Sequence, residues 1–152
     1  MTHTEVDKKI EQMWNNAPIG WAFDENQAKD MYNKWGLDFD KAEDHKKVAS
    51  IGNGGYTLKT DIPKLIEIME ESKRLRKELE NDKAEFAKQV YKYFCDYECM
   101  VTNNPDYALD ALDFEPTEEN KEIIRKQWKK FCTKNSCIYY DPFENPQTYS
   151  LQ

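Results

Sequence analysis

Residues 48–59, with the sequence VASIGNGGYTLK, predict a β-hairpin closed by Asn53-Gly54. A two-residue hairpin loop needs positive φ at both central positions, and Asn-Gly adopts this conformation at little cost. Pairing outward from the turn places Ile51 opposite Tyr56 on one apolar face of the hairpin, and Ser50 and Thr57 on the other, polar face. We therefore expect antiparallel sheet in a chain whose other patterns are mostly helical.

The rest of the chain carries helical periodicity in several segments. Apolar residues recur three or four positions apart in residues 5–14, after Thr60 and again before residue 97, whereas the short apolar run 20–23 is a candidate strand. Two prolines and no clear period mark the last residues. The predicted fold class is α+β: a predominantly helical single domain over residues 1–134, a small antiparallel sheet with strands near 20–23, 48–52 and 55–59, and an irregular C-terminal tail over residues 135–152.

Capping residues mark the starts of several helices. Side chains that can accept a hydrogen bond from the first turn of a helix stand at four expected helix starts: Asp24 or Asn26, Thr60 or Asp61, Asp82, and Thr117. Glu85 follows Asp82 by three residues, which is the pattern of a capping box. Pro105 favours the first position of a helix. The sequence thus predicts a helix directly after each of these positions.

Composition and charge argue against several classes of function. The chain has 152 residues, a formal charge of -7 and a pI of about 5.0, whereas a protein that wraps nucleic acid needs a basic surface. No apolar run approaches the ~20 residues of a membrane span, and the first residues lack the apolar core of a secretory signal. We expect a cytoplasmic protein with reduced thiols, no cofactor, no membrane contact and no direct contact with nucleic acid.

The carboxylates are unevenly distributed along the chain. Residues 96–120 contain eight acidic residues and no Lys or Arg, and six basic residues follow between 121 and 134. One interpretation is a solvated acidic surface beside a basic helix end. The other is a negative patch that binds a host protein with a basic surface. The residues predicted to contact this partner are Asp106, Asp110, Asp113, Glu115, Glu118 and Glu119.

The glycines of the hairpin have a second interpretation, as a loop that holds a phosphate group through backbone amides. This makes a small-ligand or nucleotide-binding protein the alternative function, with a pocket near Trp21 and Trp35. The phosphate-loop pattern needs Gly-Lys-Ser or Gly-Lys-Thr, which the chain lacks. A hairpin turn explains the glycines without a ligand. The residues of the alternative ligand loop are Gly52, Asn53, Gly54 and Gly55.

A third function is hydrolysis by a Glu/Cys site. Glu98 lies in an otherwise apolar helical pattern and is the carboxyl most suited to burial, although a solvent-exposed position explains it better. Four thiolates can bind zinc, but their spacing here differs from that of zinc knuckles, and buried cysteine also packs as a small apolar residue. We expect no metal. The cysteines concerned are Cys95, Cys99, Cys132 and Cys137.

Four ordered landmarks of the sequence resemble those of a small uncharacterised protein family of Firmicutes and their phages. They are WAFDENQ at residues 21–27, the Ser-Ile-Gly-x-Gly-Gly hairpin within 48–59, DYEC at 96–99 and ALDAL at 108–112. Where that family has Asn-His-Glu-Tyr, this chain has Asp-Tyr-Glu-Cys, so any chemical role of the histidine is lost here. The resemblance spans about residues 20–115 and implies a phage or mobile-element setting but no activity.

The charge pattern and this setting together favour a non-enzymatic binding protein. We expect a phage- or mobile-element-encoded inhibitor of a host nucleic-acid-handling or defence protein, similar in action to an anti-CRISPR protein. Carboxylates on a rigid segment can occupy a basic groove in place of phosphates and accelerate association. Such an inhibitor would act in the cytoplasm of the host cell. The sequence leaves its oligomeric state open.

Overall fold

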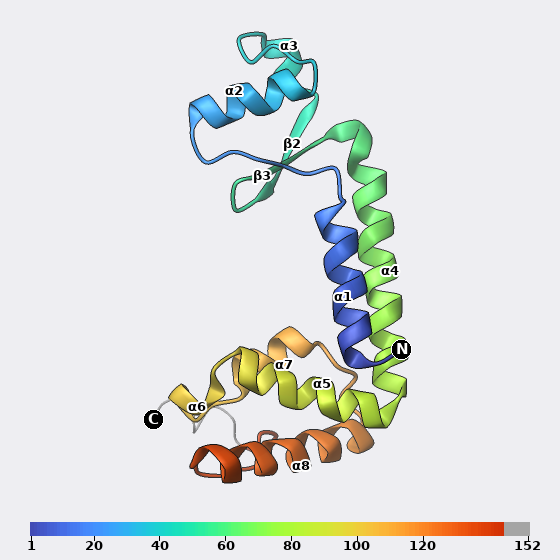
Figure 1. Ribbon diagram of the computed structural model, residues 1–152, viewed down its shortest axis with the longest axis vertical. Helices are drawn as coiled ribbons and strands as arrows, with labels where there is room; N and C mark the ends of the chain where they lie inside the picture. The colour runs from blue at the N-terminus through green and yellow to red at the C-terminus, as the bar shows by residue number, and fades with distance from the viewer. Residues whose placement is uncertain (145–152) are drawn as a thin grey trace. The chain divides into compact units, whose positions relative to one another are not determined.

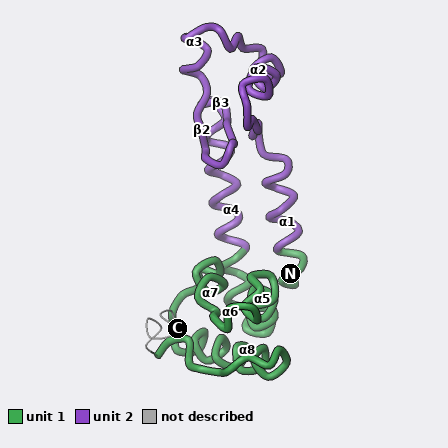
Figure 2. The backbone as a smooth tube through the Cα atoms, turned by 90° about the vertical axis from the view of Figure 1, so that its left-hand side faces the viewer, with its two compact units in different colours: residues 1–6, 76–152 green, residues 7–75 purple. Residues whose placement is uncertain are grey.

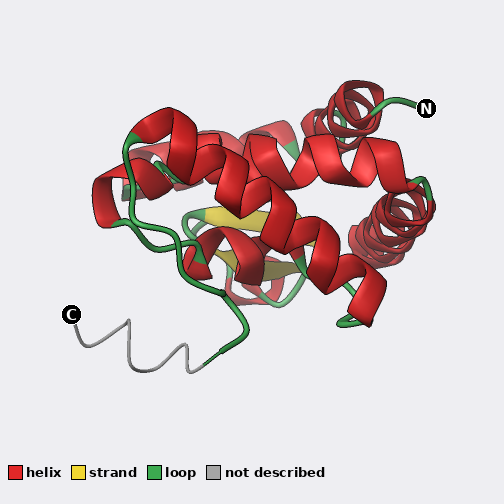
Figure 3. Cartoon of the chain, turned by 90° about the horizontal axis from the view of Figure 1, so that it is seen from below, coloured by secondary structure: helices red, strands yellow, loops and turns green. Residues whose placement is uncertain are grey.

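The computed structural model describes residues 1–144, which form two compact units (Figure 2). Of the described residues, 1–6 and 76–144 belong to unit 1, and 7–75 form unit 2. Helices make up most of the described chain, and the strands form one small sheet (Figure 3). The predicted fold class, a mostly helical α+β chain with a small antiparallel sheet, is therefore confirmed.

Unit 2 contains the sheet and the helices that flank it in the sequence (Figure 1). Two of these helices, α1 and α4, continue from one unit into the other, so the single domain over residues 1–134 stays a prediction. The elements in chain order are α1 (His3–Asn15), β1 (Gly20–Trp21), α2 (Glu25–Lys34), α3 (Ala42–His45), β2 (Val48–Gly52), β3 (Gly55–Leu58), the 3₁₀ turn Lys59–Asp61 and α4 (Ile62–Asn81).

The hairpin forms where the sequence predicts it, but its register differs from the predicted one. Asn53 and Gly54 both have positive φ, 52° and 81°, as a two-residue loop requires. Beyond the turn, Ser50 rather than Ile51 pairs with Tyr56. The register shifts at Ile51, which is the extra residue of a β-bulge, so the predicted pairing of Ile51 with Tyr56 is wrong.

The bulge changes which side chains the sheet buries. Gly52 has a φ of 91°, a conformation that glycine adopts freely, at the point where the register shifts. Thr57, which the predicted register places on the polar face, is fully buried, and its hydroxyl donates to the carbonyl of Pro18 at 2.9 Å. Ile51, which that register places on the apolar face, is exposed.

Strand β1 completes the sheet, in the order β1-β3-β2 with antiparallel neighbours. It confirms the strand expected near residues 20–23, although only Gly20–Trp21 pair. The core beside this sheet consists of Ala22, Met31 and Tyr32. Asp24 caps α2 as predicted, because its carboxylate accepts from the backbone N–H of Gln27 at 2.7 Å.

Unit 1 is helical and is built around an aromatic core. Its elements beyond α4 are α5 (Lys83–Asp96), α6 (Cys99–Thr102), α7 (Asp106–Leu112) and α8 (Glu118–Asn135). The Phe94 ring meets the Trp128 ring edge-on, with 5.2 Å between the ring centroids. The Trp128 ring stacks on the Phe131 ring, with 5.6 Å between the centroids. All three side chains are fully buried. The aromatic residues of α5 and α8 thus hold the two helices together.

Residues 136–144 contain neither helix nor strand but are tied to unit 1. The Asn103 side chain accepts from the N–H of Ile138 at 2.7 Å and donates to its carbonyl at 3.0 Å. Arg125 donates to Asp141 at 3.0 Å. The remainder of the predicted tail, residues 145–152, lies outside the described residues. Among the described helices, none combines the length and the apolarity that a membrane span requires.

Candidate functional site

The six predicted partner-binding carboxylates lie on one stretch of unit 1, which we name the acidic segment (residues 106–119). Asp106 and Asp110 lie on one side of α7 at positions i and i+4, and Asp113 follows the end of that helix with a left-handed backbone (φ 48°). Glu115 lies in the connection between helices, and Glu118 and Glu119 lie in the first turn of α8. Asp106 is partly buried, whereas the other five side chains are exposed.

The carboxylates of the acidic segment are close enough to affect one another. Burial raises the pKa of Asp106 above its ordinary value, and the neighbouring charge of Asp110 raises this pKa further. Within the described part of the chain, the one ion pair formed by the six carboxylates joins Glu118 to Lys121 at 3.7 Å. The segment therefore presents mostly uncompensated negative charge to solvent.

A buried amide holds the connection between α7 and α8. The Asn120 side chain donates to a carboxylate oxygen of Glu80 at 2.8 Å and to the carbonyl of Glu115 at 3.0 Å. It accepts from the ammonium group of Lys83 at 2.8 Å. The same Glu80 oxygen accepts from the N–H of Glu115 at 2.8 Å. This network holds the backbone at Glu115 and at the start of α8, which is the second half of the acidic segment.

Sequence reasoning missed Asn120, since its partners lie 5 to 40 residues away in the chain. The local signal that it did use, Thr117 as the helix cap, is confirmed. The Thr117 hydroxyl accepts from the N–H of Asn120 at 3.2 Å. A hydrophilic residue three positions after a cap gives no sign that its side chain is buried.

Two glycines of the alternative ligand loop, Gly54 and Gly55, allow neighbouring side chains to pack closely against the backbone. A Cβ on Gly54 would lie 2.4 Å from the ring of Phe23. A Cβ on Gly55 would lie 2.8 Å from Ile51 and 3.0 Å from Trp21. These side chains cover the glycines on that face, so close packing explains why the positions hold no side chain. The use of the loop for a phosphate stays a prediction.

The two tryptophans of the alternative function line one cavity. Trp21 and Trp35 border a space of about 440 Å³ together with Met31, and Asp30 and Lys34 supply charged groups at its wall. Such a cavity combines aromatic surface with a few polar groups, the composition typical of small-molecule sites. The structure therefore keeps ligand binding as a second candidate.

His45 is engaged in a structural contact in unit 2. Its Nε2–H donates to the carbonyl of Phe39 at 2.6 Å, which leaves Nδ1 to accept from the Tyr32 hydroxyl at 3.0 Å. Both ring nitrogens thus have partners. The side chains of Tyr32, Phe39 and His45 line a further cavity of about 360 Å³.

Two of the cysteines and Glu98, the residues of the third function, lie in different surroundings. Cys99 and Cys132 are buried, and burial raises the pKa of their thiols to about 11 and about 12. Such thiols are protonated at neutral pH and are poor nucleophiles. Glu98 is exposed and has a left-handed backbone (φ 50°) between α5 and α6, in agreement with the solvent-exposed interpretation.

The four cysteines lie in one region of unit 1. The charges of Cys95 and Cys137 contribute to the raised pKa of Cys99, after burial. Residues 1–144 nevertheless contain no group of three or more His, Cys, Asp or Glu side chains arranged to hold a metal ion. The four-thiolate zinc site that the sequence left open therefore finds no geometric support there.

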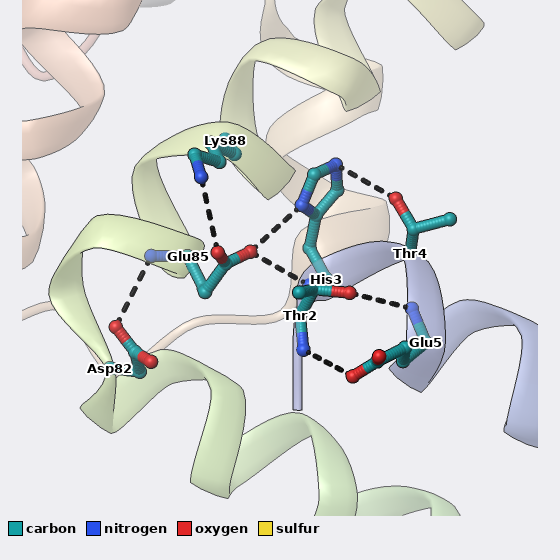
Figure 4. Close-up of polar contacts among 7 residues, drawn as sticks. All are labelled: Thr2, His3, Thr4, Glu5, Asp82, Glu85 and Lys88. Carbon is teal, nitrogen blue, oxygen red and sulfur yellow. Dashed lines mark hydrogen bonds and ion pairs between the residues drawn. The ribbon is translucent and has the colours of Figure 1, made fainter.

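An N-terminal clasp in unit 1 consists of His3, Glu85 and Lys88 (Figure 4). The backbone N–H and the ring Nδ1 of His3 both approach the same Glu85 oxygen at 2.9 Å, and Lys88 contacts the other oxygen at 3.2 Å. These contacts, led by the His3 backbone N–H, lower the pKa of Glu85 to about 2. Asp82 caps α5 as predicted. The capping box is not completed, because the Asp82 N–H donates to the carbonyls of Glu78 and Leu79, while the Glu85 carboxylate binds His3.

A small cavity of about 290 Å³ lies beside the clasp. His3, Tyr91 and Gln127 line it with three lysines. Two of these lysines have carboxylate partners, since Lys88 pairs with Glu85 and Lys92 pairs with Asp96. This partial neutralisation weakens the cavity as an anion site.

Comparison with known protein families matches residues 2–134 to a family of unknown function, DUF7659. No curated protein and no solved structure is significantly similar to the chain. The expectation of an uncharacterised family is thereby confirmed. The chain belongs to the DUF7659 family of unknown function.

Proposed function

We propose that this chain is a non-enzymatic protein that binds a basic surface of another protein through its acidic segment. The observation that supports the proposal is the exposure of five carboxylates, of which Glu115, Glu118 and Glu119 lie where the buried Asn120 holds the backbone. A fixed backbone lowers the ordering cost of binding, because the charges already have their positions before the partner arrives.

The expected mechanism is electrostatic. Carboxylates on α7 and on the first turn of α8 match Lys and Arg side chains of the partner, and the summed field accelerates encounter. Part of this charge lies at the N-terminus of α8, where the helix dipole favours anions. Dissolved ions screen the electrostatic field of the carboxylates, and the screening length shortens as the salt concentration rises. Binding of the partner should therefore weaken with increasing salt concentration.

The proposal extends to the setting of the protein. A row of carboxylates can replace phosphates in a groove that normally holds nucleic acid, so the proposed target is a host nucleic-acid-handling or defence protein. An inhibitor encoded by a phage or mobile element of Firmicutes, similar in action to an anti-CRISPR protein and acting in the host cytoplasm, fits this chemistry. The family match shows membership of a family of unknown function. The phage or mobile-element origin, the host target and the inhibitory action are our proposal.

The test is capture of host proteins on the purified full chain, with and without charge reversal. Asp110, Glu115 and Glu119 are exposed and have no role in the Asn120 side-chain network, apart from the backbone of Glu115. Replacing all three with Lys should abolish capture of the specific partner. The matched control replaces Glu11, Asp40 and Glu67, three exposed carboxylates of unit 2, with Lys and should keep it. Equal capture by both variants would refute the proposal.

A second candidate function is small-ligand binding in the cavity bordered by Trp21 and Trp35. The observation in its favour is the pairing of two indole rings with Asp30 and Lys34 around about 440 Å³. Native mass spectrometry of the protein purified from cells should then show a bound molecule that Trp35→Ala releases. An unmodified mass for the wild-type protein would count against this candidate.

A further inference from the structure

Unit 2 exposes large apolar side chains, although its core is small. Trp21 is 56% exposed and Phe23 is 73% exposed, while Ile66 and Met69 on α4 are 48% and 47% exposed. Side chains of this size usually lie inside a protein or in an interface. We name the apolar face of unit 2 by its members Trp14, Trp21, Phe23, Ile51, Ile66 and Met69.

The apolar face is continuous around a groove. Trp14, Trp21, Ile51 and Met69 line a hollow of about 580 Å³, with the buried Leu65 among its walls. Ile66 lies one helical turn from Met69 on α4 and extends the face along that helix. At the hairpin, the Trp21 ring covers Gly55 and the Phe23 ring covers the adjacent turn residue Gly54, which brings Phe23 close to Trp21 at the wall of the groove. Phe23 itself lines the neighbouring cavity that contains Tyr32 and His45.

The area of the apolar face is large for an uncovered surface. Trp14 is 36% exposed and Ile51 is 44% exposed. With the four fractions given above, the six large side chains present on the order of 600 Å² of apolar surface. This is at the upper end for the largest patch of a monomer, about 300–600 Å². It also approaches the ~800 Å² that each partner contributes to a stable interface.

We propose that a second copy of this chain covers the apolar face, in a two-fold symmetric contact. Such a contact brings the same patch of both copies together, so the patch must carry both a projection and a hollow. The apolar face has both, since Phe23 and Trp21 project beside the groove lined by Trp14 and Met69. Phe23 of each copy then enters the groove of the other.

Charge balance also favours a second copy. Unit 2 contains 11 basic and 13 acidic residues, so two copies of it repel each other weakly. Asp61 and Lys64, at the start of α4 near the apolar face, already pair with each other at 3.4 Å. This contact uses a different surface from the acidic segment and does not depend on the function proposed for that segment.

The test is sedimentation equilibrium of the purified full chain over a hundredfold range of concentration. We expect a monomer–dimer equilibrium whose dissociation constant rises at least about tenfold in Ile66→Lys and in Phe23→Asp. Val101→Lys is the matched control, because Val101 is an exposed apolar residue of unit 1 and should leave the equilibrium unchanged. Tryptophan fluorescence should shift to shorter wavelength as the dimer forms, since Trp14 and Trp21 lose water.

Several outcomes would overturn the proposal. A wild-type chain that stays monomeric at every concentration leaves the face to a different protein, and a dimer that Val101→Lys weakens equally has another interface. A dimer that survives both unit 2 variants contradicts the proposal as well. Circular dichroism checks that each variant is folded. If the Ile66→Lys variant does not fold, the Phe23→Asp variant provides the test, because Phe23 lies outside the helices and strands.

Discussion

The two units of the chain differ in the exposure of their tryptophan and phenylalanine side chains and in their charge. Unit 1 buries Phe94, Trp128 and Phe131 and exposes carboxylates, with 11 basic and 16 acidic residues. Unit 2 has nearly balanced charge and exposes Trp21 and Phe23. The difference indicates two kinds of recognition surface in one chain, one electrostatic and one apolar.

The largest expected effect concerns the aromatic residues. Trp128→Ala should lower the free energy of unfolding by about 3–5 kcal/mol, because it leaves a large cavity in the core of unit 1. Trp21→Ala should cost about 1 kcal/mol or less, since much of that side chain is already in water. Urea unfolding of both variants at low protein concentration measures the difference. Similar losses for the two tryptophans would break the comparison between the units.

The next effect concerns the network that fixes the acidic segment. Asn120→Ala should lower the free energy of unfolding by about 2 kcal/mol, because Glu80, Lys83 and the Glu115 carbonyl lose a buried partner. It should also weaken capture of a basic partner, although it removes no charge. Urea unfolding measures the loss of stability, and the capture assay measures the loss of partner binding. Unchanged capture would mean that the position of the carboxylates does not depend on this amide.

A smaller effect is expected at the buried hydroxyl of the sheet. Thr57→Val keeps the shape of the side chain but leaves the Pro18 carbonyl without its donor, at a cost of about 1–2 kcal/mol. Thermal unfolding measures the loss. Ser50→Ala, an exposed position in the paired strand β2, is the control and should change stability by less than about 0.5 kcal/mol. A neutral Thr57→Val variant would contradict the observed register.

The smallest effect is a pH dependence at the N-terminal clasp. Since the pKa of Glu85 is about 2 in the folded chain and ordinarily 4.5, the unfolded chain binds more protons between these values. The stabilisation from the clasp is therefore complete above pH 4.5 and is lost as the pH falls to about 2. Glu85→Gln should remove this part of the pH dependence. Unfolding midpoints across the window measure it, and an unchanged slope would exclude the clasp as its source.

Local signals in the sequence predicted much of the fold. Asp24, Asp82 and Thr117 cap helices as expected, and Asn53-Gly54 closes the hairpin. These features depend on a few neighbouring residues. The predicted hairpin register was wrong because strict alternation pairs each residue of one strand with one residue of the other. The bulge puts an extra residue, Ile51, into β2.

Features that depend on distant residues were not predictable in the same way. The apolar stripe that helical spacing predicts after Thr60 consists of Ile62, Leu65, Ile66 and Met69. The structure buries Leu65 and exposes the other three. Periodicity shows which residues share a face and not what covers it. The carboxylates of the acidic segment were visible as a charge pattern, whereas the buried Asn120 that fixes their backbone needed the tertiary structure.

The salt dependence of the two associations tests the contrast between the units most directly. Raising NaCl from about 0.1 M to about 1 M shortens the screening length from about 10 Å to about 3 Å. Capture of a partner by the acidic segment should fall steeply over this range, while the dimer formed through the apolar face should be unchanged or tighter. If high salt dissociates the dimer and leaves the captured partner bound, unit 1 does not bind by charge and unit 2 does not bind by apolar contact.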